Sequence, residues 1–191
     1  MGRFLAITGT PGTGKKTLAP AVAKELGLPC VGLNQLLSPG ELRKADEGVD
    51  TRKLRGRLLA TAKGTVLVYG HLVPDVLETG DVRRVVVLRC EPKVLRRRLL
   101  GRGYAAPKLR QNLEAELIGV VFADSVKRFG FAKCAQFDST SRKVRESVRA
   151  VARLLGSRKG GGAAIDWVPR YSSAEKLRSL LSDARTDSAF T

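Results

Sequence analysis

Residues 9–17 bring glycines, hydroxyls and two lysines together in an order that suits phosphate chemistry. They read Gly-Thr-Pro-Gly-Thr-Gly-Lys-Lys-Thr and lie between an apolar run, residues 4–7, and a helical pattern, residues 18–26. A glycine loop between a strand and a helix lets backbone N–H groups surround an anion, and the helix N-terminus adds partial positive charge. An ordinary Gly/Pro turn is the alternative. The position, the spacing and Lys15, which can reach terminal phosphates, favour a loop that binds a nucleoside triphosphate.

The residues of this loop are the first candidates for a nucleotide-binding site. We expect backbone amides between Gly12 and Thr17 to hold the phosphates, and Lys15 to counter the charge of the β- and γ-phosphates. The predicted cofactor-binding residues in the loop are Gly9, Gly12, Thr13, Gly14, Lys15, Lys16 and Thr17. The hydroxyl of Thr17 is the candidate ligand for a metal ion that accompanies the nucleotide.

Two arginines and a histidine further along the chain complete the candidate site. Phosphoryl transfer depends mostly on positioning and on neutralising charge. We expect Arg102 to close over the bound nucleotide and Arg98 to bind beside it; a solvated basic helix face is the alternative. His71 is the single histidine and follows an apolar run, where it either orients water or a phosphate or has a structural role. Lys15, His71 and Arg102 are the predicted catalytic residues.

The elements that must position these side chains alternate along the chain. Strands are predicted at 3–8, 29–32, 65–69, 83–89 and 133–137, and helices at 15–26, 51–63, 91–101, 107–128 and 141–156. This order favours βαβ units. The predicted fold class is α/β, a P-loop NTPase-like, doubly wound parallel sheet of five strands flanked by helices. Ligands of such sheets lie outside the carboxyl ends of the strands, where we expect the glycine loop, His71 and Arg89 to converge.

The composition indicates a globular chain. With 191 residues, 43% of them hydrophobic, the chain is long enough for one domain with a sizeable core. No apolar run approaches the ~20 residues that span a membrane, and no signal-peptide pattern is visible. We therefore expect a soluble cytoplasmic protein (nuclear in a eukaryote) with no membrane partner. The widely spaced Cys30, Cys90 and Cys134 are predicted to be small buried hydrophobes, not a disulfide framework or metal site.

The charge of the chain is strongly positive. It has 35 Lys and Arg against 18 Asp and Glu, a formal net charge of +17. Such an excess favours binding to nucleic acid or to a ribonucleoprotein surface, because binding there releases counterions. A generally basic proteome or a salt-adapted surface is the alternative.

The domain organisation follows from a change in composition near residue 157. Residues 1–156 are predicted to form the nucleotide-binding domain, and residues 157–164 a flexible linker. Residues 165–169 are apolar and include the single Trp, and residues 172–175 have a capping-box pattern for a short helix through Leu181. This tail, residues 157–191, either packs back on its own domain or binds a partner.

Three motifs together resemble one known family. The first is the loop, with Pro at its third position. The second is the string from Arg98 and Arg102 through Tyr104, Lys108 and Asn112 to Glu116, and the third is Gly70-His71 after an apolar strand. In this order they resemble the coilin-interacting nuclear ATPase family, also called the isoenzyme-6-type adenylate kinases. The resemblance covers roughly residues 3–117.

That resemblance implies a compact adenylate-kinase-like fold that binds ATP and Mg²⁺. It implies a monophosphate-binding segment at about residues 32–50 and a short lid at about residues 101–112, ordered by Tyr104 and Asn112. Members of the family show adenylate kinase activity, with AMP as acceptor, and ATPase activity. They assist maturation of the small ribosomal subunit by holding a platform ribosomal protein near the 3′ end of its ribosomal RNA or pre-rRNA.

Two residues depart from the expected pattern. Lys16 stands where phosphate loops normally offer a hydroxyl to the metal, and Tyr69 stands where the family has Asp. A neutral phenol cannot supply the charge that helps to hold hydrated Mg²⁺. We therefore expect nucleotide binding with slow turnover, with Asp75 as a candidate replacement for the missing carboxylate.

Three functions are consistent with these residues. The first is an adenylate-kinase-like ATPase that acts in small-subunit ribosome assembly. The second is a nucleotide-gated assembly scaffold with little or no turnover, which Tyr69 and Lys16 favour. The third is a housekeeping monophosphate kinase, which the charge and the short lid disfavour, because a small anionic substrate does not require charge spread over the whole surface.

Overall fold

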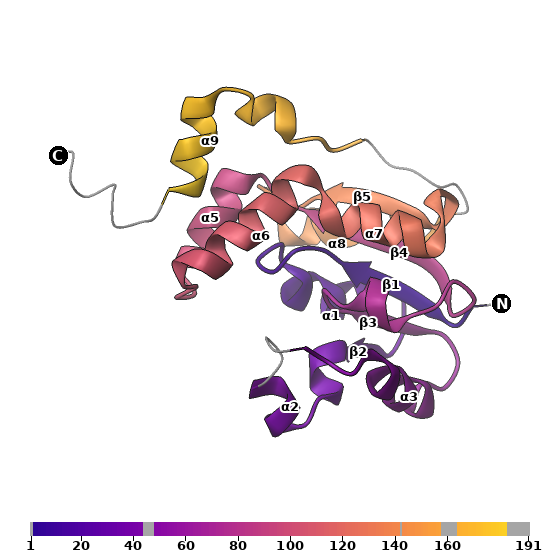
Figure 1. Cartoon of the computed structure of the whole chain (residues 1–191). Helices are drawn as coiled ribbons and strands as arrows, with labels where there is room; N and C mark the ends of the chain where they lie inside the picture. The colour runs from indigo at the N-terminus through magenta and orange to yellow at the C-terminus, as the bar shows by residue number, and fades with distance from the viewer. Residues whose placement is uncertain (1, 44–47, 142, 158–163, 183–191) are drawn as a thin grey trace.

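A parallel sheet of five strands forms the centre of the molecule. The computed structural model describes residues 2–43, 48–141, 143–157 and 164–182. The strands are β1 (Phe4–Thr8), β2 (Cys30–Gly32), β3 (Val66–Tyr69), β4 (Val82–Arg89) and β5 (Cys134–Asp138). Their order in the sheet is β2-β3-β1-β4-β5 (Figure 1). The predicted fold class, including the number of strands, is confirmed.

The first strand of the chain lies in the middle of this sheet. β1 pairs in parallel with β3, where Ile7 lies opposite Tyr69, and with β4, where Ile7 lies opposite Val86. All five residues of β1 are buried, which suits a central strand covered on both faces. The carboxyl ends of β1, β3 and β4 therefore meet at one edge, and the glycine loop begins there.

Three groups of helices surround the sheet. One face is covered by α1 (Lys15–Glu25) and α8 (Val144–Gly156). The other is covered by α3 (Thr51–Thr61), α4 (Val73–Val76) and α7 (Val120–Phe129). A third group at the carboxyl edge contains α5 (Pro92–Leu100), α6 (Ala106–Ile118) and α9 (Ala174–Leu181) (Figure 1). The short elements α2 (Pro39–Arg43), η1 (Leu33–Leu36), η2 (Phe131–Lys133) and η3 (Val168–Tyr171) connect them.

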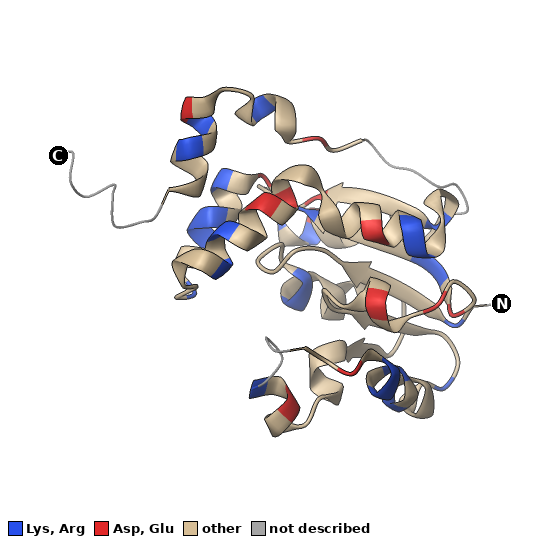
Figure 2. Ribbon diagram, in the orientation of Figure 1, with Lys and Arg blue, Asp and Glu red and all other residues tan. Residues whose placement is uncertain are grey.

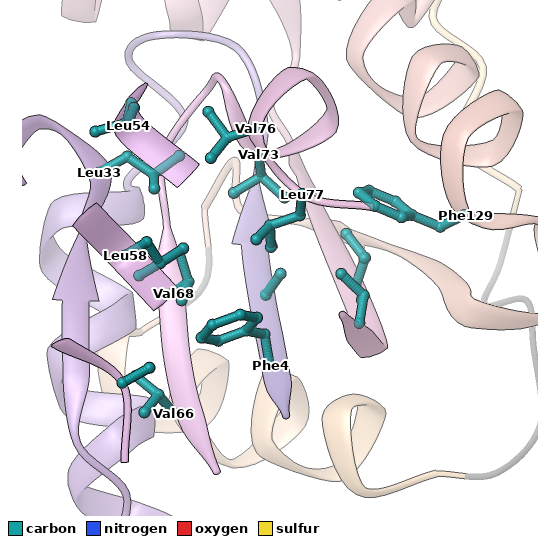
Figure 3. Packing of buried hydrophobic residues seen from close by; sticks show 14 of the residues in the cluster. Phe4, Leu33, Leu54, Leu58, Val66, Val68, Val73, Val76, Leu77 and Phe129 are labelled. Carbon is teal, nitrogen blue, oxygen red and sulfur yellow. The ribbon is translucent and has the colours of Figure 1, made fainter. Parts of the chain in front are cut away.

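Alternation along the strands divides the core between the two faces. Phe4 and Val68 point toward the layer of α3 and α4, where they pack with Leu54, Leu58 and Leu77 (Figure 3). Their strand neighbours Leu5 and Leu67 belong to the opposite cluster, under α1 and α8. The fully apolar runs of β1 and β3 thus supply side chains to both faces and fix the sheet that carries the loop.

The predicted helix at 107–128 is wrong in one respect, because the structure has two helices there. α6 ends and α7 begins at Gly119, which has a φ of 73°. A Cβ on Gly119 would lie 3.1 Å from Nη1 of Arg89, so the break also makes room for that guanidinium. The sequence prediction also missed the short helices α2 and α4.

The tail packs back on its own domain, as one of the two sequence alternatives predicts. Trp167 is 4% exposed and Leu180 is 3% exposed, both within the cluster of α5 and α6. α9 begins after Ser173, whose side chain accepts a hydrogen bond from the N–H of Lys176, so the cap is Ser173 and not the predicted box at 172–175. Most of the predicted linker, 158–163, lies outside the described residues. We call residues 164–182 the C-terminal strap.

Within the described part of the chain, no helix is both long and apolar enough to cross a membrane.

Candidate functional site

The glycine loop links β1 to α1 through three glycines with positive φ. Gly9, Gly12 and Gly14 have φ values of 139°, 92° and 96°. A Cβ on Gly9 would lie 2.3 Å from the Leu88 carbonyl oxygen, and one on Gly12 would lie 2.5 Å from a Leu95 methyl carbon. Both conformation and space therefore require glycine at these positions. Gly14 is the N-cap of α1, so the loop presents the free N–H groups of a helix start.

The hydroxyls of the loop stabilise its curvature. Thr13 is fully buried, and its Oγ1 donates to the Thr10 carbonyl oxygen at 2.8 Å. The backbone oxygen of Thr13 accepts from Ser139 Oγ at 2.8 Å, and the same hydroxyl lies 2.8 Å from the Arg89 carbonyl oxygen. The loop is therefore tied to the ends of β4 and β5.

Lys15 lies over the loop. Its Nζ donates to the carbonyl oxygens of Gly9 at 2.5 Å and Thr10 at 2.9 Å. Burial is the main cause that lowers the pKa of Lys15 to about 7; Glu116 opposes this shift, and Arg102 and Lys16 add to it. The ammonium has carbonyl partners but no adjacent carboxylate partner among the described residues, and an anion at the loop would supply the missing charge.

The two lid arginines occupy different environments. Arg102 is exposed in the turn between α5 and α6, and its charge acts on Lys15, so it lies within electrostatic range of the loop. Arg98 is half-buried, and its Nη2 donates to the carbonyl oxygens of Ser139 at 3.2 Å and Thr140 at 2.8 Å. Arg98 thus joins α5 to the segment that supports the loop, while Arg102 remains accessible to a ligand.

The predicted lid at 101–112 is half turn and half helix. α5 ends at Leu100 and α6 begins at Ala106, so only residues 101–105 are non-helical. Tyr104 packs in the cluster between these helices, and Asn112 Nδ2 donates to the Lys108 carbonyl oxygen at 2.6 Å. The packing of Tyr104 fixes the base of the turn that carries Arg102.

His71 lies at the end of β3, beside the start of the loop. The N–H of Gly70 donates to the Ile7 carbonyl oxygen at 3.2 Å, which extends the pairing of β3 with β1. His71 follows in an exposed turn. His71 therefore follows the strand that pairs with β1, at the edge of the sheet where the loop begins, and its catalytic role stays a prediction.

Arg89, by contrast, lies inside the protein and does not face a ligand position. It is 3% exposed, and its Nε pairs with Glu116 Oε1 at 2.8 Å. Its Nη1 donates to the side-chain oxygen of Gln136 at 2.6 Å and to the carbonyl oxygen of Ile165 at 3.1 Å, and its Nη2 donates to the backbone oxygen of Glu116 at 2.7 Å. The expectation that Arg89 converges on the ligand with His71 is wrong, because the guanidinium is occupied by the buried carboxylate.

Tyr69 stands where the related motif has a carboxylate, and Asp75 is the candidate replacement. The Tyr69 ring packs on β2, where a Cβ on Gly32 would lie 2.8 Å from Tyr69 Oη. Burial raises the pKa of Tyr69, so the phenol stays neutral. Asp75 is on α4, and the charges that act on it, after burial, are those of Asp124 and Arg128 on α7. Asp75 therefore lies within electrostatic range of α7.

Few residues of the described part of the chain are candidates for binding a metal ion. The part of the chain that the structure describes contains no group of three or more His, Cys, Asp or Glu side chains that could hold a metal ion. Thr17 is exposed in the first turn of α1, beside the exposed Lys16. Mg²⁺ bound to nucleotide phosphates keeps most of its waters and needs few protein ligands, so Thr17 stays a prediction as a ligand of a metal that arrives with the nucleotide.

Glu116, for which no role was predicted, lies under the loop. It is 1% exposed, and its Oε2 accepts from Thr10 Oγ1 at 2.6 Å. Its Oε1 accepts from the backbone N–H of Cys90 at 2.9 Å as well as from Arg89. The sequence indicated Glu116 only as the last residue of the motif that runs from Arg98 to Glu116. Its burial was not expected, because a carboxylate on a helix is normally solvated.

The predicted monophosphate segment, 32–50, is described except for residues 44–47. A hollow of about 390 Å³ is lined by Gly40, Glu41, Gly48, Val49, Asp50 and Lys53. Arg57 binds Glu41 through two nitrogens, at 2.7 and 3.1 Å, and this hydrogen bonding lowers the pKa of Glu41 to about 2. Glu41 is therefore ionised, with Arg57 and Lys53 beside it.

The three cysteines are free thiols in the structure. Cys90 and Cys134 are buried, and burial raises the pKa of each to about 11. Their thiols therefore stay protonated, as predicted for small buried hydrophobes. Cys30 is half-buried on β2.

The fold and loop define a class of fold, the P-loop fold, in which a parallel sheet is flanked by helices and a glycine loop opens the first helix. A gluconokinase from Sinorhizobium meliloti matches with a TM-score of 0.58 at 21% identity, covering 81% of this chain and 91% of that chain. A shikimate kinase from Bacteroides thetaiotaomicron matches with a TM-score of 0.56 at 22% identity, covering 81% and 98%. At these identities the likeness shows the fold.

Sequence similarity then shows the family. A family profile described as AAA domain matches residues 5–119. Proteins named "Putative adenylate kinase" are 32% identical in Thermococcus kodakarensis, over 88% of this chain and 94% of theirs, and 35% identical in Natronomonas pharaonis, over 77% and 88%. One from Methanocaldococcus jannaschii is 28% identical over 87% and 94%. The chain belongs to this AAA-domain family and, within it, to the group of these archaeal proteins.

Proposed function

We propose that this protein binds ATP and transfers its γ-phosphoryl group to AMP or to water, as an adenylate kinase and ATPase. The observation that carries the proposal is the glycine loop at the start of α1, with Lys15 over it and Arg102 within electrostatic range. The family relatives named for adenylate kinase support the same reaction.

In this reaction an oxygen of the acceptor attacks the γ-phosphorus of ATP. The bond from that phosphorus to the β–γ bridging oxygen breaks, and ADP leaves. With AMP as acceptor the products are two ADP; with water they are ADP, inorganic phosphate and a proton. Backbone N–H groups of residues 12–17 bind the phosphates, and Lys15 and Arg102 neutralise the charge on the transferring group. His71, at the end of β3, orients the attacking water or a phosphate.

The metal enters as part of the substrate, MgATP. Thr17 offers one hydroxyl to it, and Lys16 adds positive charge near the phosphates. With Tyr69 packed on Gly32, the protein lacks the acidic residue of the related motif at this position. We therefore propose slow turnover. Tyr69→Asp is expected to raise the ATPase rate or its dependence on Mg²⁺; an unchanged rate and an unchanged Mg²⁺ dependence would refute this part of the proposal.

The test of the reaction is ADP formation from ATP with and without AMP, together with phosphate release. Lys15→Met is expected to lower kcat/KM by about 10²-fold or more, because one preorganised charge contact is worth that much in a transition state. Lys24→Met is the matched control, since Lys24 is an exposed lysine in the last turn of the same helix. Equal activity of the two variants would contradict the proposal.

A more specific role is maturation of the small ribosomal subunit in the cytoplasm. Its support is the resemblance of the lid motif to the ribosome-associated family and the net charge of +17. The partners are then a platform ribosomal protein and ribosomal RNA or pre-rRNA. Turnover that rises when either partner is added supports this role.

The alternative is a nucleotide-gated scaffold with little or no turnover, which Lys16 and the neutral Tyr69 favour. It predicts saturable ATP binding without ADP formation under every condition, and partner binding that changes with the bound nucleotide. Equilibrium binding and turnover measured on the same sample separate the two functions.

A further inference from the structure

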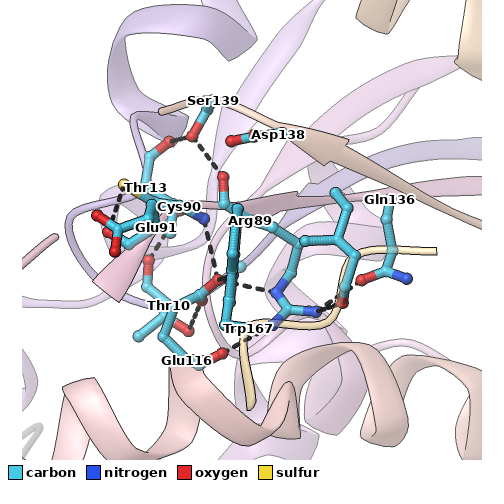
Figure 4. A network of polar contacts seen from close by, with 12 residues as sticks. Thr10, Thr13, Arg89, Cys90, Glu91, Glu116, Gln136, Asp138, Ser139 and Trp167 are labelled. Atoms are coloured by element: carbon cyan, nitrogen blue, oxygen red, sulfur yellow. Dashed lines mark hydrogen bonds and ion pairs between the residues drawn. The ribbon is translucent and has the colours of Figure 1, made fainter. Parts of the chain in front are cut away.

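A buried carboxylate connects the phosphate-binding loop to the C-terminal strap. Glu116 is 1% exposed, Thr10 is 2% exposed and Trp167 is 4% exposed. One oxygen of Glu116 accepts from Thr10 Oγ1 at 2.6 Å, and the other accepts from Trp167 Nε1 at 3.3 Å (Figure 4). Thr10 of the glycine loop and Trp167 of the strap therefore donate to the same carboxylate, that of Glu116 on α6.

From Thr10 the same network reaches Lys15. The carbonyl oxygen of Thr10 accepts from Lys15 Nζ at 2.9 Å and from Thr13 Oγ1 at 2.8 Å. In a dry interior such linked hydrogen bonds strengthen one another and favour a single arrangement. Thr10 therefore forms hydrogen bonds both to Glu116, through its hydroxyl, and to Lys15, through its carbonyl oxygen.

The strap is attached to the same buried ion pair at a second point. Arg89 binds Glu116 through Nε at 2.8 Å and donates from Nη1 to the Ile165 carbonyl oxygen at 3.1 Å. Further along, the Tyr171 hydroxyl donates to the carboxylate of Glu91 at the start of α5 and accepts from the N–H of Lys93 at 3.2 Å. The strap therefore has one attachment through the carboxylate of Glu116 and another, through Tyr171, that does not involve Glu116.

We propose that Glu116 is a positioning residue for the phosphate-binding loop and that Trp167 completes its hydrogen bonding, so that nucleotide binding and docking of the strap are coupled. This inference rests on the proposed binding of ATP at the loop. Because coupling between two sites is reciprocal, ATP at the loop stabilises the docked strap, and a docked strap tightens ATP binding. The residues at 165–167 thus belong functionally to the nucleotide site, although they lie outside the family match at 5–119.

The single tryptophan allows a direct test on the full chain. ATP binding is measured by equilibrium dialysis with labelled nucleotide, and Trp emission is titrated in parallel. We expect the emission to change with the same half-saturation as the dialysis. Saturable dialysis with unchanged emission overturns the coupling while ATP binding stands; no binding in the dialysis overturns the proposed function itself.

Two aromatic variants of the strap separate coupling from simple packing. Trp167→Phe keeps an aromatic ring but removes the donor to Glu116. Tyr171→Phe is the matched control, because it removes the hydrogen bond to Glu91 and leaves the Glu116 network intact. We expect Trp167→Phe to raise the KM for ATP by roughly fivefold or more with little change in kcat, and Tyr171→Phe to leave both constants within about twofold. Equal effects of the two variants, or none from Trp167→Phe, refute the proposal.

The loop side of the network provides a rescue experiment. Thr10→Val removes the hydroxyl that binds Glu116, and Thr10→Ser restores one. The Ser variant is expected to recover most of the ATP affinity that the Val variant loses. The double variant, Thr10→Val with Trp167→Phe, is expected to lose less ATP affinity than the product of the two single losses. Fully multiplicative effects would show that the two contacts act independently. Circular dichroism of each variant establishes that it is folded.

Discussion

Lys15 is held by two backbone carbonyl groups of the glycine loop. Its pKa falls to about 7, chiefly because of burial. A bound triphosphate places negative charge next to the ammonium and raises that pKa again. Protonation of Lys15 and nucleotide binding are therefore linked, and the linkage has a definite sign.

We predict that ATP binding takes up a proton above pH 7. In the free protein Lys15 loses its proton as the pH rises through about 7, whereas in the complex it stays protonated to higher pH. Affinity should therefore decline as the pH rises from 7 toward 9. Calorimetry at pH 8 in buffers of different ionisation enthalpy measures the uptake. Lys15→Met should abolish it and Lys16→Met should not; equal uptake in both variants would rule out Lys15 as the source.

Two glutamates of α6, Glu116 and Glu114, pair with arginines, and we predict that replacing each one lowers the free energy of unfolding by a very different amount. Glu116→Gln leaves Arg89 buried without its counter-ion, and breaking a buried pair costs about 3–5 kcal/mol. Glu114 pairs with Arg110 at 2.9 Å on the exposed face of the same helix. Its replacement by Gln should cost about 0.5 kcal/mol or less. Urea unfolding of both variants checks the difference; similar free energies of unfolding would mean that the Arg89–Glu116 pair contributes little.

The residues of the glycine loop could be predicted from the sequence, but the buried residue that holds the loop in place, Glu116, could not. Gly9, Gly12 and Lys15 are close in sequence, and their spacing alone indicates a turn that surrounds an anion. Glu116 lies 106 positions from the threonine that it binds. Such a contact depends on how α6 packs against the sheet, and no local pattern encodes it. The Arg89 prediction failed for the same reason, since its partner comes from α6.

At the scale of elements, the break at Gly119 decides how α6 and α7 are arranged. A continuous helix from 107 to 128 would direct both segments along one axis, whereas the break lets α6 reach the loop and α7 cover the sheet. Apolar periodicity continues through the break, so the pattern predicted one helix. The strands were predictable chiefly where the run is buried and rich in Val, as in β3 and β4. β5, with the sequence Cys-Ala-Gln-Phe-Asp, has no β-branched residue.

Gly119→Ala should destabilise the protein more than Gly27→Ala. Both glycines have positive φ at a helix end, 73° and 64°, which costs an L-residue about 1–2 kcal/mol. A Cβ at Gly27 meets no atom within 4 Å, whereas one at Gly119 lies 3.1 Å from the guanidinium of Arg89. Because Arg89 is fixed by its hydrogen bonds, overpacking adds roughly 1 kcal/mol or more. The readout is the midpoint of urea unfolding, and equal midpoints would show that Arg89 moves aside freely.

At the scale of the whole molecule, positive charge is spread over several surfaces. Lys and Arg lie on helices of all three groups (Figure 2). On α8, the exposed Arg145, Arg149 and Arg153 are spaced four residues apart, so they follow one face of the helix. The opposite face, with Val148 and Val151, is buried on the sheet.

If RNA is a partner, replacing these three arginines should weaken binding in a salt-dependent way. Each phosphate contact to a single strand contributes about 0.7 to the slope of log K against log salt. Changing Arg145, Arg149 and Arg153 to Gln should therefore reduce that slope by roughly 2. The control changes Lys24, Lys127 and Arg178 to Gln, with the same loss of net charge from separate elements. An equal reduction in the control would assign binding to overall charge and not to α8.

The position of the C-terminal strap has a consequence for how the protein is made. The glycine loop is translated well before Trp167, which shares Glu116 with Thr10. At common translation rates the interval between Thr10 and Trp167 is roughly 8–30 s. A nascent chain therefore carries the loop long before it can complete the buried hydrogen bonds beneath it, and the network is complete only after Trp167 has left the ribosome.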